Sequence, residues 1–191
     1  MSIKQGSAHH AGSLSPEFAL LGFLIAGSRH GYDLHQRFVV ELGNVWHLSQ
    51  SQAYAILKRL EKRGDISSQI IEQEKLPARQ RLRITAAGRR RFMDWLENCA
   101  SHNSRSIRLE FLTRLYFTNL YSPEKNALIY ATQYAEIKKE IERIENMLAH
   151  LPPDQTFNRL SLDLRLRQIK LIQEWMAEIK IKFQITAEET S

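Results

Sequence analysis

Basic side chains are concentrated between Lys58 and Arg91, and their type suggests a chemistry. This stretch holds eleven lysines and arginines against four carboxylates. Guanidinium and ammonium groups neutralise phosphates and release the counterions condensed on a nucleic acid, which supplies most non-specific DNA affinity. The whole chain carries a net charge of +6, with a pI of about 9.5. Both values favour a polyanionic partner, either a nucleic acid or an anionic membrane surface.

The first of these basic residues belong to a predicted helix between Ser49 and Gly64. Ser49 is a good N-cap, and Gly64 stands where a left-handed residue ends a helix. The apolar residues of this stretch follow helical spacing and share one face: Ala53, Ile56, Leu57 and Leu60. The opposite face carries Ser51, Tyr54, Ala55, Lys58 and Lys62, with Arg59 at its edge. Such a helix packs by one side and presents the other.

After this helix the period changes to an alternation of two. Residues 66–71 and 80–84 predict two strands joined by the Pro-containing turn EKLPAR, residues 74–79. Alternation places Arg79, Arg81 and Arg83 on one face of the resulting hairpin. Thr85 is then expected to cap a helix whose inner side carries Phe92, Trp95 and Leu96.

Two further helices are predicted before the basic stretch. Ser15, Pro16 and Glu17 have the order of a capping serine, a first-turn proline and an acid near the positive end of the helix dipole. An almost wholly apolar run follows and ends at Gly27, and a second helix is expected from about residue 32 to 42. Three helices followed by a basic hairpin are the element order of a winged helix-turn-helix. The predicted fold is therefore mostly α, with a flexible arm over 1–14 and the winged domain over 15–100.

In this fold the third helix enters the major groove and the hairpin contacts phosphates. The helix N-terminus favours phosphate, and its glutamines also suit adenine edges. The Tyr54 hydroxyl could bind a phosphate, or its ring could pack against the second helix. Lys58 and Arg59 suit phosphates or guanine. Arg59 is equally suited to an ion pair with Asp65 or Glu61. The predicted DNA-binding residues are Ser49, Gln50, Ser51, Gln52, Tyr54, Lys58, Arg59, Lys75, Arg79 and Arg81.

Residues 105–187 are predicted to form a separate helical domain that makes a homodimer. Apolar residues from Tyr130 to Leu151 alternate steps of four and three, which is typical of paired helices. A last helix, about 158–185, has apolar residues on more than one side and therefore needs several neighbours. The residues predicted to form the dimer interface are Tyr134, Ile137, Ile141, Ile144, Leu148, Ile172, Trp175, Met176 and Ile179.

The residues from Phe18 to Trp95 resemble the PadR family of bacterial transcriptional regulators. The resemblance rests on a set of motifs in register: LLGFLIAGSRHGYDL with its His30-Gly31-Tyr32 triplet, Trp46-x-x-Ser49, Tyr54-x-x-Leu57-Lys58-Arg59-Leu60-Glu61-x-x-Gly64, Pro77-x-Arg79 and Arg83-Ile84-Thr85-x-x-Gly88. It implies C-terminal dimerisation helices, a phosphate contact from the Tyr54 hydroxyl, and a repressor whose DNA affinity an effector lowers. Trp175, Tyr116 and Tyr121 are candidates for lining an effector pocket, although core packing explains them equally well.

The chain departs from the family pattern at groove-facing positions. Gln50 and Ser51 replace a frequent proline and glycine, Ala55 replaces a frequent proline, and Arg81 and Leu82 stand where aromatic residues are common. The DNA sequence that other members read is therefore not expected to transfer.

Other classes of function fit the sequence less well. The chain shows no nucleophile, phosphate-loop or metal-ligand spacing, so we expect neither an enzyme nor a cofactor or metal. Its single cysteine, Cys99, suits a reducing cytoplasm, and no apolar run is long enough to span a membrane. The main alternative to sequence-specific binding of duplex DNA at a palindromic operator is a winged helix that contacts only other proteins.

Overall fold

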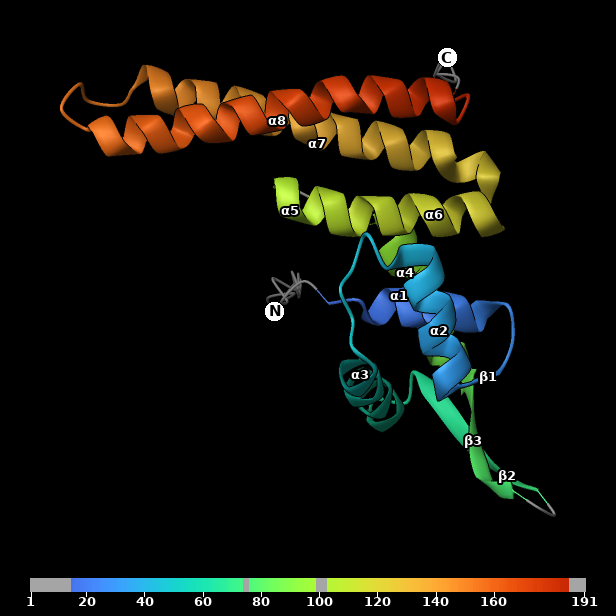
Figure 1. The fold of residues 1–191 in the computed structure, drawn as a ribbon. Coiled ribbons are helices and arrows are strands. Elements are labelled where there is room, and N and C mark those ends of the chain that lie inside the picture. The colour runs from blue at the N-terminus through green and yellow to red at the C-terminus, as the bar shows by residue number, and fades with distance from the viewer. Residues whose placement is uncertain (1–14, 74–75, 99–102, 186–191) are drawn as a thin grey trace, which may run out of the picture.

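The computed structural model describes residues 15–73, 76–98 and 103–185, with the backbone alone described at 71–73, 76–79 and 98. Helices dominate, and a small sheet projects from the amino-terminal part as a wing (Figure 1). The elements follow in the order α1 (Glu17–Ile25), β1 (Arg29–His30), α2 (Gly31–Leu42), α3 (Gln50–Lys62), β2 (Ile66–Gln73), β3 (Leu76–Ile84), α4 (Ala86–Asn98), α5 (Ser104–Ser106), the π-helix η1 (Ile107–Phe111), α6 (Leu112–Tyr121), the 3₁₀ helix η2 (Pro123–Lys125), α7 (Asn126–Ala149) and α8 (Thr156–Lys182).

The sheet has three antiparallel strands in the order β1-β3-β2. The predicted hairpin is confirmed, but its strands are longer than expected, because Gln73 pairs with Leu76 and Ile71 with Arg79. Residues 76–79 of the stretch predicted as a turn therefore belong to β3. The edge strand β1 was not predicted. It places Arg29 opposite Leu82 and His30 opposite Arg81, so the residues before α2 bind the wing.

The first hydrophobic core joins α1 to the helices of the winged domain. Phe23 of α1 is fully buried and its ring meets Phe38 at 6.4 Å and Phe117 at 5.2 Å. Apart from Glu17, α1 is apolar, and it is thus the buried helix that its sequence predicts. Its expected capping differs, because the N-cap position is Pro16 and no side chain caps it. The Ser15 hydroxyl instead accepts a hydrogen bond from Arg59 at 3.4 Å.

Helix α6 and the π-helix before it are shared by two hydrophobic cores. Leu109 and Phe117 belong to the first core, whereas Ile107, Phe111 and Leu115 belong to a second core formed with α7 and α8. Residues four apart lie on the same side of a helix, so the two sets occupy opposite faces. Figure 1 shows α6 between the winged part and the α7–α8 pair. The first core therefore extends beyond the boundary that we predicted at residues 100–105.

Helices α7 and α8 form an antiparallel pair within one chain (Figure 1). All nine residues predicted for the dimer interface lie in the second core or are packed against it. Ile137 and Ile144 are each 1% exposed and Met176 is fully buried, so the apolar seam of α7 is covered by α8 of the same chain. Tyr134, Leu148, Ile172 and Trp175 are only half-buried, so the predicted dimer contacts stay a prediction.

Candidate nucleic-acid interface

Helix α3 has the predicted caps at both ends. The Ser49 hydroxyl accepts a hydrogen bond from the Gln52 N–H at 3.2 Å, and the Gln52 side chain accepts one from the Ser49 N–H at 3.0 Å. This reciprocal capping box satisfies two backbone donors at the helix start. Gly64 has a φ of +79°, the left-handed conformation expected after the C-terminus. Gln52 therefore holds the start of the helix together as well as facing outward.

The predicted outward face of α3 is exposed. Gln50, Ser51, Gln52 and Lys58 all reach solvent, as does Ser49, whereas Ala53 and Leu60 are fully buried. The exposed residues carry amide, hydroxyl and ammonium groups, the donors and acceptors that read base edges and phosphates.

Tyr54 packs against the start of α2 and stays partly exposed, and its predicted phosphate contact stays a prediction. Its side chain is 45% exposed, while its ring rests on the backbone at Gly31, where α2 begins. A Cβ atom at Gly31 would come within 2.8 Å of the Tyr54 ring. Glycine at this position thus lets the Tyr54 ring approach the start of α2 closely.

A groove of about 650 Å³ separates α3 from the wing. Tyr54, Lys58 and Glu61 line one side, and Gln80 and Leu82 of β3 line the other. His30 also lines the groove, and its ring Nδ1 lies 3.1 Å from the Gln80 carbonyl oxygen. Because side chains alternate along β3, Arg81 and Arg83 lie on the face of the hairpin opposite this groove. For Arg81 and Arg83 the expected shared face is present, but it is turned away from α3.

The three wing residues predicted to bind DNA are described to different extents. Arg81 is exposed and pairs across the sheet with Gln69. The side chain of Arg79 and the whole of Lys75 lie outside the described residues, so their predicted roles stay predictions.

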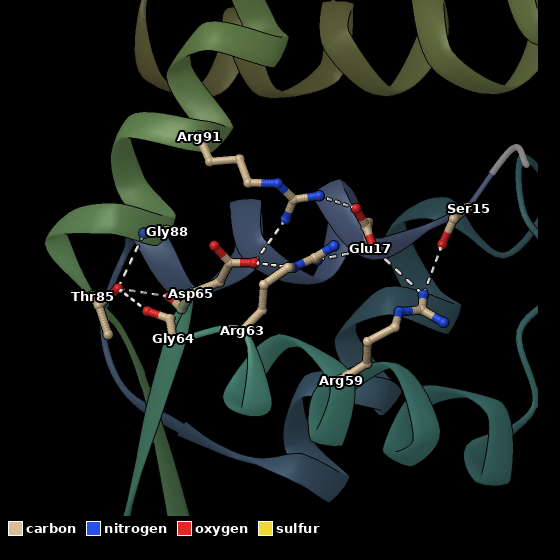
Figure 2. Close-up of polar contacts among 9 residues, drawn as sticks. All are labelled: Ser15, Glu17, Arg59, Arg63, Gly64, Asp65, Thr85, Gly88 and Arg91. Carbon is tan, nitrogen blue, oxygen red and sulfur yellow. Dashed lines mark hydrogen bonds and ion pairs between the residues drawn. The ribbon is translucent and has the colours of Figure 1, made fainter. Parts of the chain in front are cut away.

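Arg59 does not join the exposed face of α3 but a cluster of ion pairs, shown in Figure 2. Glu17 at the start of α1 pairs with Arg59 at 3.4 Å, with Arg63 at 3.1 Å and with Arg91. Asp65 pairs with Arg63 at 2.7 Å and with Arg91 at 2.8 Å. Three of the eleven basic residues are thus ion-paired with two carboxylates at this junction. Arg59 forms an ion pair, but not with the expected Asp65 or Glu61, because Glu17 of α1 supplies the carboxylate.

The two carboxylates of this cluster are largely shielded from water, since the side chains of Glu17 and Asp65 are 11% and 6% exposed. Burial raises the pKa of Glu17, but the hydrogen bonds and charges of Arg91 and Arg63 outweigh it. The net effect lowers the pKa below its ordinary value of 4.5. Glu17 is therefore held as a carboxylate that fixes the end of α3 against α1 and α4.

Backbone contacts lock the same junction. The Thr85 hydroxyl donates to the Gly64 carbonyl oxygen at 2.7 Å and accepts from the Gly88 N–H at 3.0 Å, which confirms Thr85 as the cap of α4 (Figure 2). A Cβ at Gly88 would overlap the carbonyl oxygen of Asp65. Helix α3, the wing and α4 consequently meet at one rigid point.

Residues 20–94 match the family model described as the transcriptional regulator PadR-like family. The amino-terminal part of the chain is thus similar to this PadR-like family. The match runs from α1 to α4 and thus includes α3, the wing and the groove between them.

Individual PadR-like proteins match over more of the chain. The negative transcriptional regulator PadR of Bacillus subtilis (strain 168) is 26% identical over 131 residues, which are 68% of this chain and 70% of the relative. The crystal structure of B. subtilis PadR in complex with operator DNA has a TM-score of 0.44 at 25% identity and covers 87% of this chain and 98% of that chain. B. subtilis PadR in complex with p-coumaric acid has a TM-score of 0.40 at 24% identity, over 88% and 95%.

The aromatic residues that we considered for an effector pocket pack against two different cores. Tyr116 packs against Phe23 at 6.0 Å in the first core, and Tyr121 donates from its hydroxyl to the Gly22 carbonyl oxygen at 3.0 Å. Trp175 meets Phe111 at 6.4 Å in the second core. Core packing is thus the role that the structure gives to all three.

In the part of the chain that the structure describes, none of the helices has the length and apolar character that a membrane span needs.

Proposed function

We propose that this chain binds a two-fold symmetric DNA operator as a homodimer and represses transcription there. The observation that carries the proposal is the exposed polar face of the doubly capped helix α3 within a PadR-like domain. A helix of this width fits the major groove, and side chains on its outer face reach base edges.

The exposed residues divide into two groups by their chemistry. Gln50 and Ser51 lie at the helix start, where free N–H groups and the helix dipole attract a phosphate, and the amide of Gln50 also suits an adenine edge. Tyr54 and Lys58 lie further along the same face and point toward the groove. We assign Lys58 to a phosphate or a guanine and the Tyr54 hydroxyl to a phosphate. Arg81 contacts the DNA backbone from the far side of the wing.

Because α8 of the same chain covers much of the α7 seam, we propose a further surface for the dimer. Helix α8 offers one, because Phe157, Leu160, Leu164 and Leu171 are 86%, 59%, 57% and 66% exposed and follow steps of three, four and seven. Positions with these steps form one stripe along a helix, and burying each such side chain contributes about 1.5–3 kcal/mol. We propose that the stripe of a second copy covers this one.

The sign of regulation is supported by a relative. The B. subtilis protein that shares 26% identity with this chain is a negative regulator. The family resemblance adds an effector that lowers DNA affinity, and we propose that it acts through α7 and α8 by changing the separation of the two α3 helices. An effector that binds without altering DNA affinity contradicts this part of the proposal.

Selection of bound duplexes from a random pool by the purified full chain tests the proposal. We expect a two-fold symmetric consensus, since operator symmetry mirrors protein symmetry. The competing possibility, a winged helix that contacts only proteins, predicts weak binding with no sequence preference, and that outcome would overturn the proposed function.

A further inference from the structure

The segment that leads into α3 is hydrogen-bonded to α6, a helix outside the winged part. Residues 43–49 connect α2 to α3 without regular secondary structure. Within this segment the indole N–H of Trp46 donates to the Thr113 hydroxyl on α6 at 2.8 Å. Trp46 is 7% exposed and Thr113 is 1% exposed, so water competes little for this bond. Trp46 precedes the capping residue Ser49 by three positions.

Two further contacts make this segment stiff. The backbone N–H of Trp46 donates to the Leu42 carbonyl oxygen at 2.8 Å, which ties the segment to the end of α2. The ring Nε2 of His35 contacts the Leu48 carbonyl oxygen at 2.9 Å. A displacement of Trp46 is therefore passed to Ser49 rather than absorbed between them.

The other end of the contact leads to the C-terminal helices. The Thr113 hydroxyl also donates to the Leu109 carbonyl oxygen at 2.6 Å, within the π-helix η1. One face of the same helical stretch packs Phe111 against Trp175 of α8. Irregular π turns are frequent where a helix serves a function. Thr113 thus lies between the second core and the segment that positions α3.

We propose that Trp46 and Thr113 are positioning residues that fix the direction of α3 relative to the C-terminal helices, and so set the half-site spacing that the protein accepts. This inference rests on the proposed dimeric DNA binding. In a dimer joined by α8, the two α3 helices are related through α8, α6 and the Trp46–Thr113 contact. Loss of the contact leaves each winged part able to bind a half-site but orients the two parts less strictly.

Helix α6 contains a matched control. Thr118 is fully buried, like Thr113, and its hydroxyl also donates to the carbonyl oxygen four residues earlier, that of Arg114 at 2.8 Å. Thr113→Val and Thr118→Val therefore make the same chemical change in the same helix. Thr113→Val alone removes the acceptor of the Trp46 N–H.

The experiment measures the affinity of the full chain for the selected operator and for duplexes with the half-sites moved apart by one or two base pairs. Two base pairs rotate one half-site by about 70°, so wild-type affinity falls sharply. We expect Thr113→Val to reduce this discrimination by about three- to tenfold, with affinity for a single half-site unchanged. Thr118→Val keeps the wild-type discrimination.

A second variant covers the possibility that Thr113→Val folds poorly. The double variant Trp46→Phe with Thr113→Val removes donor and acceptor together, leaves no buried N–H without a partner, and is expected to show the same relaxed spacing. Suppose that the wild-type protein binds a two-fold site specifically, and that the Thr113→Val and Thr118→Val proteins discriminate equally between half-site spacings. That result would overturn this inference and leave the proposed function standing. A wild-type protein that selects no two-fold site overturns the proposed function, and this inference with it.

Discussion

Replacing Glu17 with glutamine removes the carboxylate shared by three arginines at the junction of α1, α3 and α4. Exposed ion pairs contribute about 0.2–1 kcal/mol, whereas breaking a fully buried pair costs about 3–5 kcal/mol. The side chain of Glu17 is 11% exposed, but those of Arg91, Arg63 and Arg59 are 28%, 39% and 54% exposed. Solvent screening therefore places the expected loss of unfolding free energy at about 1–2 kcal/mol at pH 7. For a chain of this size the loss corresponds to a Tm decrease of about 2–8 °C.

The same substitution has a definite pH dependence. The pKa of Glu17 in the folded protein lies below its ordinary value of 4.5, so its contribution to stability is complete above that value and is lost as the pH falls through the folded pKa. Glutamine resembles the protonated form. The difference in unfolding free energy between wild type and Glu17→Gln should therefore be largest near pH 7 and shrink below about pH 4.5.

Urea unfolding followed by circular dichroism, repeated between pH 7 and the acid limit of the folded state, measures this difference. Glu142→Gln is the control, because Glu142 is exposed on α7 and the substitution makes the same change in net charge. A Glu17→Gln protein as stable as wild type at pH 7, or a difference that stays constant as the pH falls, would refute the reasoning about the cluster.

Three further predictions concern helix α3, the start of α4 and helix α8. Lys58→Ala should flatten the salt dependence of DNA binding by about one unit, whereas Arg59→Ala should not, because the Arg59 guanidinium is ion-paired with Glu17. Equal slopes in titrations at several salt concentrations would show that both contact phosphate. Gly88→Ala should lower the unfolding free energy by about 1–3 kcal/mol, since its Cβ overlaps the backbone of Asp65, and wild-type stability in urea unfolding contradicts that overlap. Leu164→Glu should convert the dimer to a monomer in analytical ultracentrifugation, and an unchanged mass means that the α8 stripe is not the interface.

The parts of the fold that local signals determine were predictable from the sequence. Helix α3 is the best example, because its caps at Ser49 and Gly64 and its apolar spacing all lie within the helix or beside it. Its exposed face followed directly from the same spacing. The strand β1 was missed because its two residues become a strand only by pairing with residues about 50 positions later.

Contacts between distant segments account for the incorrect expectations. The partner of Arg59 is Glu17, 42 residues earlier, and nothing in the spacing around Arg59 indicates it. The seam of α7 was predicted correctly as an apolar surface, but periodicity does not reveal whether the covering helix belongs to the same chain or to a second copy. The orientation of Arg81 likewise depends on which face of the hairpin meets α3.

The sharing of α6 between two cores limits where this protein can be divided in engineering. Gly22 of α1 lies so close to Phe117 of α6 that an added Cβ would be 2.5 Å from its ring, and Phe92 meets the same ring at 5.4 Å. A truncated winged domain that ends before Ser104 would lose the Phe117 ring and expose the cavity that this ring fills. A chimera that grafts a new sensory module onto this DNA reader should therefore place its junction after Tyr121 and retain α6.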